Sequence, residues 1–193
     1  MLPADPRDDL DEIRELNRLF IEFLRTCYRR GGECLDLDRS TARLLGEATA
    51  DCLQTLADLP RALFELRLSD PPLLNVGDPR SDVAQPSWQA LQLTILHSAW
   101  HMSRRNPYAA RLFLGLEEGE LRFLRTTALC ELPRLSTVTG LVACAFPRSA
   151  WLWSRLLTET RPESRRQLLL IALQPQLKTP GPQPQPLGQQ ITA

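Results

Sequence analysis

The sequence contains almost no lysine, no long apolar run and no closely spaced pair of cysteines. No window approaches the roughly 18 consecutive apolar residues of a membrane-spanning helix. The first residues are acidic and lack the basic and apolar regions of a secretory signal. The five cysteines include no C-x-x-C pair, which argues against a disulfide framework and a structural zinc site. We therefore expect a cytoplasmic protein without a membrane anchor, whose cysteines are reduced and mostly packed.

Motifs for catalysis are also missing. The sequence has neither a glycine-rich phosphate-binding loop nor a G-x-S-x-G nucleophile motif. His97 and His101 are four residues apart, a spacing that two zinc ligands could use, but no nearby cysteine or carboxylate completes a metal site. A cysteine nucleophile would need a histidine partner, and both histidines fall on one predicted helix. The sequence thus predicts no enzymatic activity, no catalytic residues, no metal and no cofactor.

The charge is zero overall but is divided unevenly along the chain. Residues 1–68 hold 10 basic and 14 acidic residues, a balance of −4, whereas residues 69–193 hold 13 basic and 9 acidic residues, a balance of +4. All of the basic residues except Lys178 are arginines. Arginine suits bidentate binding of phosphate or carboxylate, so the second half is the better place to look for anion binding. The same bias can also reflect genome composition.

Apolar spacing of three and four residues predicts helices along most of the chain, and hence an all-α fold. A first long helix is expected over about 9–30, followed by short helices capped near Asp38 and Thr49. A second long helix is expected over 88–105, capped by Ser87 and ended by Asn106-Pro107. Residues 69–87, with four prolines, are predicted to be a linker. The Pro/Gln-rich segment 174–193 is predicted to be a disordered tail.

The two halves also match each other, without a gap, when the chain is shifted so that Leu35 falls on Leu114. The same shift matches Leu37 with Leu116, Asp38 with Glu117, Leu45 with Leu124, Leu53 with Leu132, and Leu56 with Leu135. This pattern predicts two helical repeats, 8–68 and 88–173, that pack as a pseudo-dimer within one chain. The alternative is that two amphipathic helical stretches align at some offset without a common origin.

The second repeat resembles the FlhD family, the small subunit of the flagellar master transcriptional activator. The resemblance covers residues 91–146 without gaps and continues to a segment ending R-L-L-T at 155–158. Its features are the turn Leu114-Gly115-Leu116, the acidic start of the next helix at Glu117-Glu118, and Leu124, Leu132 and Leu135. The first repeat is similar from about 16 to 68, with Leu35-Asp36-Leu37-Asp38 in place of the turn.

The resemblance implies an all-helical protein that dimerises and works with an FlhC-type subunit. In that family the partner supplies the zinc site and much of the DNA contact, and the heteromer binds promoter DNA and helps recruit RNA polymerase. The cysteine that bridges the family's dimer would fall on Phe64 and Ala143, with Cys144 beside the latter. The implied function is control of flagellar genes. Alternatives are activation of conjugative transfer of a mobile element, or a protein-interaction or anti-activator module that does not bind DNA.

The segment around Gly115 could be a DNA-reading helix-turn-helix or a structural corner. A helix-turn-helix needs a small residue four positions before the turn glycine, where this chain has Arg111, and its second helix begins with Glu117, Glu118 and Glu120, which repel phosphates. We therefore expect a structural corner. The DNA-binding candidates are arginines elsewhere, each of which could equally lie on a solvated face or contact a partner protein: Arg104, Arg105, Arg111, Arg155, Arg161, Arg165 and Arg166.

Overall fold

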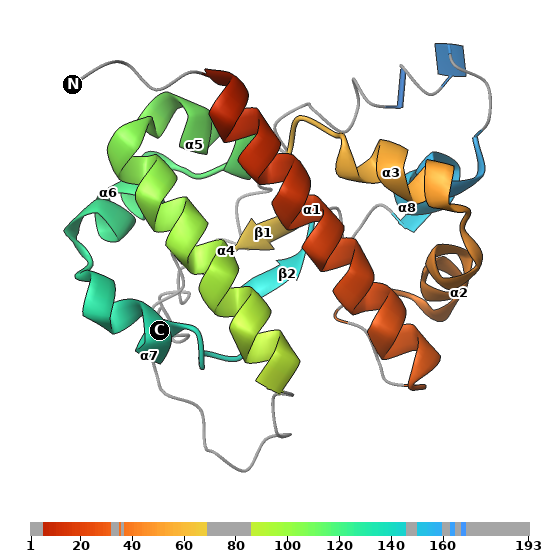
Figure 1. Ribbon diagram of the computed structural model, residues 1–193, viewed down its shortest axis with the longest axis horizontal. Coiled ribbons are helices and arrows are strands. Elements are labelled where there is room, and N and C mark those ends of the chain that lie inside the picture. The colour runs from red at the N-terminus through yellow and green to blue at the C-terminus, as the bar shows by residue number, and fades with distance from the viewer. Residues whose placement is uncertain are drawn as a thin grey trace, which may run out of the picture.

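The computed structural model describes residues 6–31, 35, 37–68, 86–145, 150–159, 163–164 and 167–168. Most of the predicted linker, the whole predicted tail, and the candidate residues Arg161, Arg165 and Arg166 lie outside these ranges. Within them the chain is mostly helical (Figure 1). No helix in the described part is long and apolar enough to cross a membrane.

The elements fall into two groups separated by residues 69–85. The first group consists of helices α1 (Pro6–Arg29), α2 (Arg39–Glu47) and α3 (Ala50–Ala57) and strand β1 (Phe64–Leu66). The second consists of α4 (Pro86–Arg105), α5 (Pro107–Leu114), α6 (Glu118–Thr126), the 3-10 turn η2 (Leu129–Glu131), α7 (Leu132–Leu135), strand β2 (Val142–Cys144) and α8 (Ala150–Thr158).

Several predicted helix ends are confirmed. The Asp38 side chain caps α2 by accepting a hydrogen bond from the Thr41 backbone N at 3.0 Å, and Thr49 caps α3. Hydrogen bonds from Ser40 and Thr41 lower the pKa of the Asp38 carboxyl to about 2. Gly115 ends α5 with φ of 69°, a left-handed conformation that favours glycine.

The predicted cap of the second long helix is wrong. This helix, α4, begins at Pro86, so Ser87 lies inside its first turn. Proline is well suited to that position because the first amide groups of a helix have no partner within the helix. Asn106 ends α4 as predicted and also caps the next helix, where its side chain accepts a hydrogen bond from Ala109 N at 3.2 Å.

The prediction of a purely helical fold needs a correction, because β1 and β2 form a small antiparallel sheet. Phe64 pairs with Cys144, Glu65 with Ala143, and Leu66 with Val142. Each strand is a run of only three residues inside an apolar stretch. Such a run carries no helical or strand periodicity of its own, which is why no strand was predicted from the sequence.

The long helices α1 and α4 lie against each other and run in opposite directions across the sheet (Figure 1). Phe23 stacks on Trp88 at 4.7 Å between ring centroids near one end of this crossing. Helix α1 also contacts α2 and α3, and α4 contacts α6 and α7. Helix α8 comes from the end of the second group but packs on α2 and α3 of the first.

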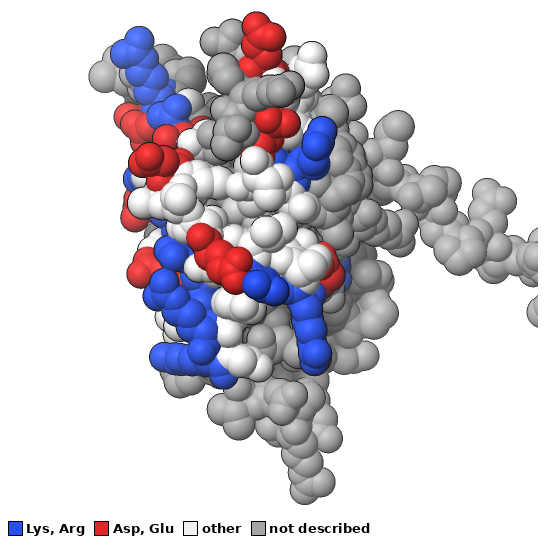
Figure 2. Space-filling view, turned by 90° about the vertical axis from the view of Figure 1, so that its right-hand side faces the viewer, with Lys and Arg blue, Asp and Glu red and all other residues white. Residues whose placement is uncertain are grey.

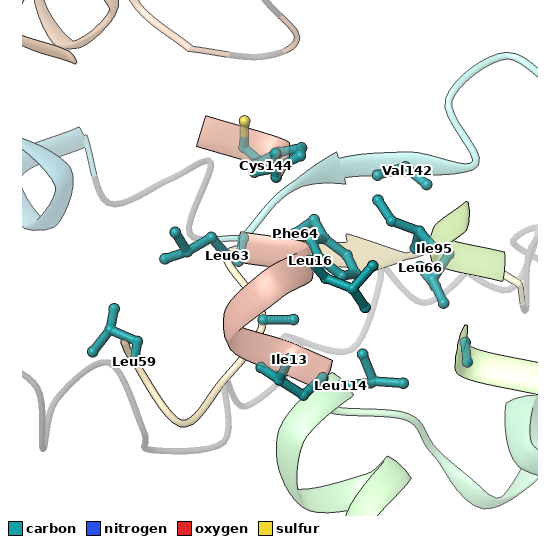
Figure 3. Packing of buried hydrophobic residues seen from close by; sticks show 14 of the residues in the cluster. Ile13, Leu16, Leu59, Leu63, Phe64, Leu66, Ile95, Leu114, Val142 and Cys144 are labelled. Atoms are coloured by element: carbon teal, nitrogen blue, oxygen red, sulfur yellow. The ribbon is translucent and has the colours of Figure 1, made fainter. Parts of the chain in front are cut away.

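One hydrophobic core joins the two groups. Figure 3 shows buried side chains from both groups converging around the sheet; those labelled are Ile13, Leu16, Leu59, Leu63, Phe64, Leu66, Ile95, Leu114, Val142 and Cys144. Because burial of apolar surface is the main stabilising term in folding, each group depends on the other to cover its share of this core.

The register of the sheet predicts a disulfide in the variant Phe64→Cys. The bonds from Arg67 N to Leu141 O and from Ala145 N to Leu63 O flank the ladder, so Phe64 and Cys144 form a non-hydrogen-bonded pair. Such pairs have Cα atoms about 4.5 Å apart, within the range of disulfides. On mild oxidation we expect the introduced thiol to bond with Cys144, as measured by peptide mapping after alkylation.

The matched control is Leu66→Cys, which lies on the same strand but faces Val142. The thiol introduced at position 66 should form no disulfide, so it should still react with the alkylating reagent after the oxidised protein is unfolded. A disulfide from position 64 to any other cysteine would contradict the register.

Candidate nucleic-acid interface

Helix α4 presents a basic and polar surface with no acidic residue. Its sequence, PSWQALQLTILHSAWHMSRR, contains neither aspartate nor glutamate. His97, His101 and Arg104 are exposed at spacings of four and three residues, so they share one face of the helix. In the described part of the chain no group of three or more His, Cys, Asp or Glu residues is placed to hold a metal.

Arg104 is held in place where the C-terminal end of α4 meets that of α6. Its Nη2 donates to Arg125 O at 2.7 Å and to Thr127 O at 3.3 Å, and its guanidinium lies 4.3 Å from the Trp100 ring centroid. Trp100 Nε1 also donates to Thr127 O, at 2.9 Å. The carbonyls at a helix C-terminus carry partial negative charge, and a cation over an indole face is attracted to it, so both contacts stabilise this placement.

Arg122 and Arg125 extend the positive charge along α6, which lies beside the C-terminal half of α4 (Figure 1). Both are exposed. We call Arg104, Arg122 and Arg125 the α4–α6 arginine cluster. None of the three forms an ion pair with a carboxylate among the described residues.

The nearest carboxylates in the sequence have other partners. Glu118 Oε2 lies 3.9 Å from Arg111 Nη1, and Glu131 accepts a hydrogen bond from Ala128 N at 3.0 Å. Glu120 is buried, and its carboxylate accepts from Glu117 N at 2.8 Å, which closes a capping box at the start of α6. The acidic residues of α6 therefore lie in its first turn, whereas Arg122 lies at its middle and Arg125 in its last turn.

Arg105, one of the predicted DNA-binding residues, has an internal partner instead. Its Nη2 pairs with Asp9, whose side chain is 0% exposed, and lies 3.4 Å from Glu12 Oε2. Asn106 Nδ2 donates to the other carboxylate oxygen of Asp9 at 2.8 Å. Arg105 thus links α1 to the α4–α5 junction, and its charge is matched within the fold.

The other predicted residues do not gather on one surface. Arg111 is exposed beside Glu118 at the Gly115 corner. Arg155 is exposed on α8, which lies on the far side of the molecule from α6 (Figure 1). Of the described candidates only Arg104 belongs to the α4–α6 arginine cluster.

Sequence reasoning missed Arg122 and Arg125. The prediction for the segment after Gly115 relied on its glutamates and left out the two arginines that follow them in the same helix. The signal that could have found them is the three-residue spacing of two arginines on the exposed face of a helix, together with the absence of acidic residues on α4.

On the opposite side of the molecule, some of the described basic side chains have acidic partners. Figure 2 shows basic and acidic side chains next to one another in places on the face that carries α2, α3 and α8, around a largely uncharged middle. Arg43 Nε lies 2.9 Å from Glu47 Oε1, and Arg18 lies 3.0 Å from Glu15 and 3.5 Å from Asp58. Such pairing reduces the attraction that a phosphate would experience there.

Comparisons of the chain with known protein families, with curated proteins and with solved structures found no match. Function is therefore inferred from the residues and contacts of the chain itself.

Proposed function

We propose that this chain is a tandem FlhD-like subunit of a heteromeric transcriptional activator in the cytoplasm, with its two halves paired as a pseudo-dimer. The observation that carries the proposal is a constant offset between the elements of the two halves. Helix α2 spans 39–47 and α6 spans 118–126, so the shift that brings Leu35 onto Leu114 also brings both ends of α2 onto those of α6. The same shift brings the start of α3 at 50 onto the start of η2 at 129.

The pairing of the strands supports a two-fold relation between the halves. The same shift brings Phe64 onto Ala143 and Glu65 onto Cys144. Phe64 pairs with Cys144 and Glu65 pairs with Ala143, so the ladder maps onto itself. A two-fold axis between two equal strands produces this result, as in a symmetric dimer. The family's bridging cysteine maps to Phe64 and Ala143, which lie within this ladder.

A buried amide in each half supports the same relation. Asn17 Nδ2 on α1 donates to Ala57 O at 3.3 Å. Gln92 on α4, in the amide orientation that pairs both of its polar atoms, donates to Ser136 O at 2.8 Å. Ala57 falls on Ser136 under the same shift, so each long helix bonds the equivalent carbonyl of its own half, from positions that differ by one helical turn.

A tandem arrangement removes the need for a covalent bridge between subunits. The connection between the halves keeps their effective concentration high, and the shared core around the sheet supplies the contacts. The resulting surface is that of one FlhD-like dimer, available to an FlhC-type subunit that carries zinc.

The test is co-purification of the full chain with an FlhC-type subunit from the same genome, with and without genomic duplex DNA. We expect a stable heteromer that enriches promoter fragments, whereas the chain alone enriches none. Sequencing of those fragments separates control of flagellar genes from control of conjugative transfer. A heteromer that never retains DNA would favour the interaction or anti-activator role, and no heteromer would contradict the proposal.

A further inference from the structure

We propose that the α4–α6 arginine cluster binds the phosphate backbone of duplex DNA. This inference rests on the proposed function, and it gives this chain a direct contact with DNA in addition to any made by a partner. The cluster was defined above by Arg104, Arg122 and Arg125, on two helices that meet at their C-terminal ends.

The first argument is unmatched charge. Three guanidinium groups lie on adjacent helices without a carboxylate partner in the described part of the chain, and α4 contributes no acidic side chain at all. Like charges close together repel one another unless an anion lies between them. A phosphate backbone supplies a row of such anions, and its binding releases counterions from the DNA.

The second argument is preorganisation. Arg104 is already fixed by two carbonyl oxygens and the Trp100 ring, so little side-chain freedom remains to be lost on binding. Arg122 and Arg125 project from one short helix whose first turn is fixed by a capping box. The cluster therefore presents its charges from a rigid framework.

The third argument concerns the class of partner. The exposed residues of α6 are Glu118, Gly119, Arg122, Arg125 and Thr126, with no large apolar side chain among them. An interfacial membrane helix requires an apolar face to insert, which α6 does not expose. A protein partner normally meets large side chains such as aromatic residues at the centre of an interface, and Phe123 on α6 is half-buried. Duplex DNA needs only the charges.

The experiment measures binding of the full-length chain to a short fluorescent duplex of arbitrary sequence at several salt concentrations. The variant is Arg122→Gln with Arg125→Gln, which removes two charges from exposed positions. For wild type we expect weak binding with a steep dependence of affinity on salt. For the variant the slope of log affinity against log salt should be smaller by about two, because each phosphate contact contributes roughly one.

The matched control is Arg39→Gln with Arg43→Gln, which removes the same charge from exposed positions on α2. This control should leave the salt slope unchanged. A third variant, Arg122→Lys with Arg125→Lys, should restore most of the binding, since lysine also binds phosphate as a point charge. Circular dichroism spectra and melting curves of all variants should match those of wild type.

Three results would overturn the inference. An equal decrease of the salt slope in both double Gln variants would mean that overall charge, and not the cluster, attracts DNA. Loss of FlhC-type partner binding with DNA binding unchanged would make the cluster a protein interface. Absence of any duplex binding by the wild-type chain at low salt would remove the direct contact, but it would leave the proposed function standing, because that function is tested by heteromer formation.

Discussion

Replacing Asp9 by alanine is expected to lower the free energy of unfolding by about 3 kcal/mol. Asp9 is fully buried near the start of α1 and is the shared acceptor for Arg105 and Asn106. Its removal leaves the Arg105 guanidinium, whose side chain is 25% exposed, with only the longer contact to Glu12. The loss of a buried ion-pair partner is costly because the remaining charge stays desolvated without compensation. Urea denaturation followed by circular dichroism measures the change.

The control for this prediction is Asp11→Ala on the same helix. Asp11 forms an ion pair with Arg14 at 2.9 Å, but its side chain is 71% exposed, so solvent screens the interaction. We expect a change of less than about 1 kcal/mol. If both variants lost the same small amount of stability, Asp9 would not link α1 to the α4–α5 junction in the way the contacts indicate.

Arg105 also illustrates the limit of sequence reasoning about charge. Local patterns placed it correctly at the end of a long helix, next to Asn106, where basic residues favour the helix dipole. Its partner Asp9 is 96 residues away in the sequence. Because the neighbouring residues in the sequence do not indicate a contact over that distance, the sequence alone could not distinguish an arginine paired within the fold from an exposed one.

Local signals were sufficient where local chemistry decides the structure. Asp38 and Thr49 cap α2 and α3 because their short polar side chains can accept hydrogen bonds from the first turn. Gly115 ends α5 because its left-handed conformation disfavours other residues. The strands were missed because Phe64–Leu66 becomes a strand only by pairing with Val142–Cys144, a contact between segments far apart in the chain.

The candidate interface was predicted in part for the same reasons. Arg104 was identified from the basic end of a predicted helix. Arg122 and Arg125 were not identified, because the prediction for that segment was based on the glutamates at the start of α6. The structure separates the two ends of the helix: the Glu120 carboxylate is used for capping, and the arginines remain on the exposed face.

Replacing Asn17 by alanine is expected to destabilise the protein by about 3–5 kcal/mol, from several buried groups that lose a partner at once. Asn17 is 0% exposed on α1. Its Nδ2 donates to Ala57 O at 3.3 Å, Leu59 O at 3.4 Å and Arg61 O at 3.0 Å, and its Oδ1 accepts from Leu63 N at 2.9 Å. These bonds hold the loop that leads from α3 into β1.

The comparison that makes this prediction specific is Gln92→Ala in the other half of the molecule. Gln92 bonds one loop carbonyl, Ser136 O, and accepts from Trp88 Nε1 at 3.0 Å. Because Gln92 makes fewer contacts with its loop, Gln92→Ala should lower the free energy of unfolding by only about 1–3 kcal/mol. Hydrogen exchange gives a local readout, because the Leu63 amide should lose protection in Asn17→Ala and keep it in Gln92→Ala. Equal costs, or unchanged protection of Leu63 when Asn17 is replaced, would mean that the loop is held by core packing and not by this amide.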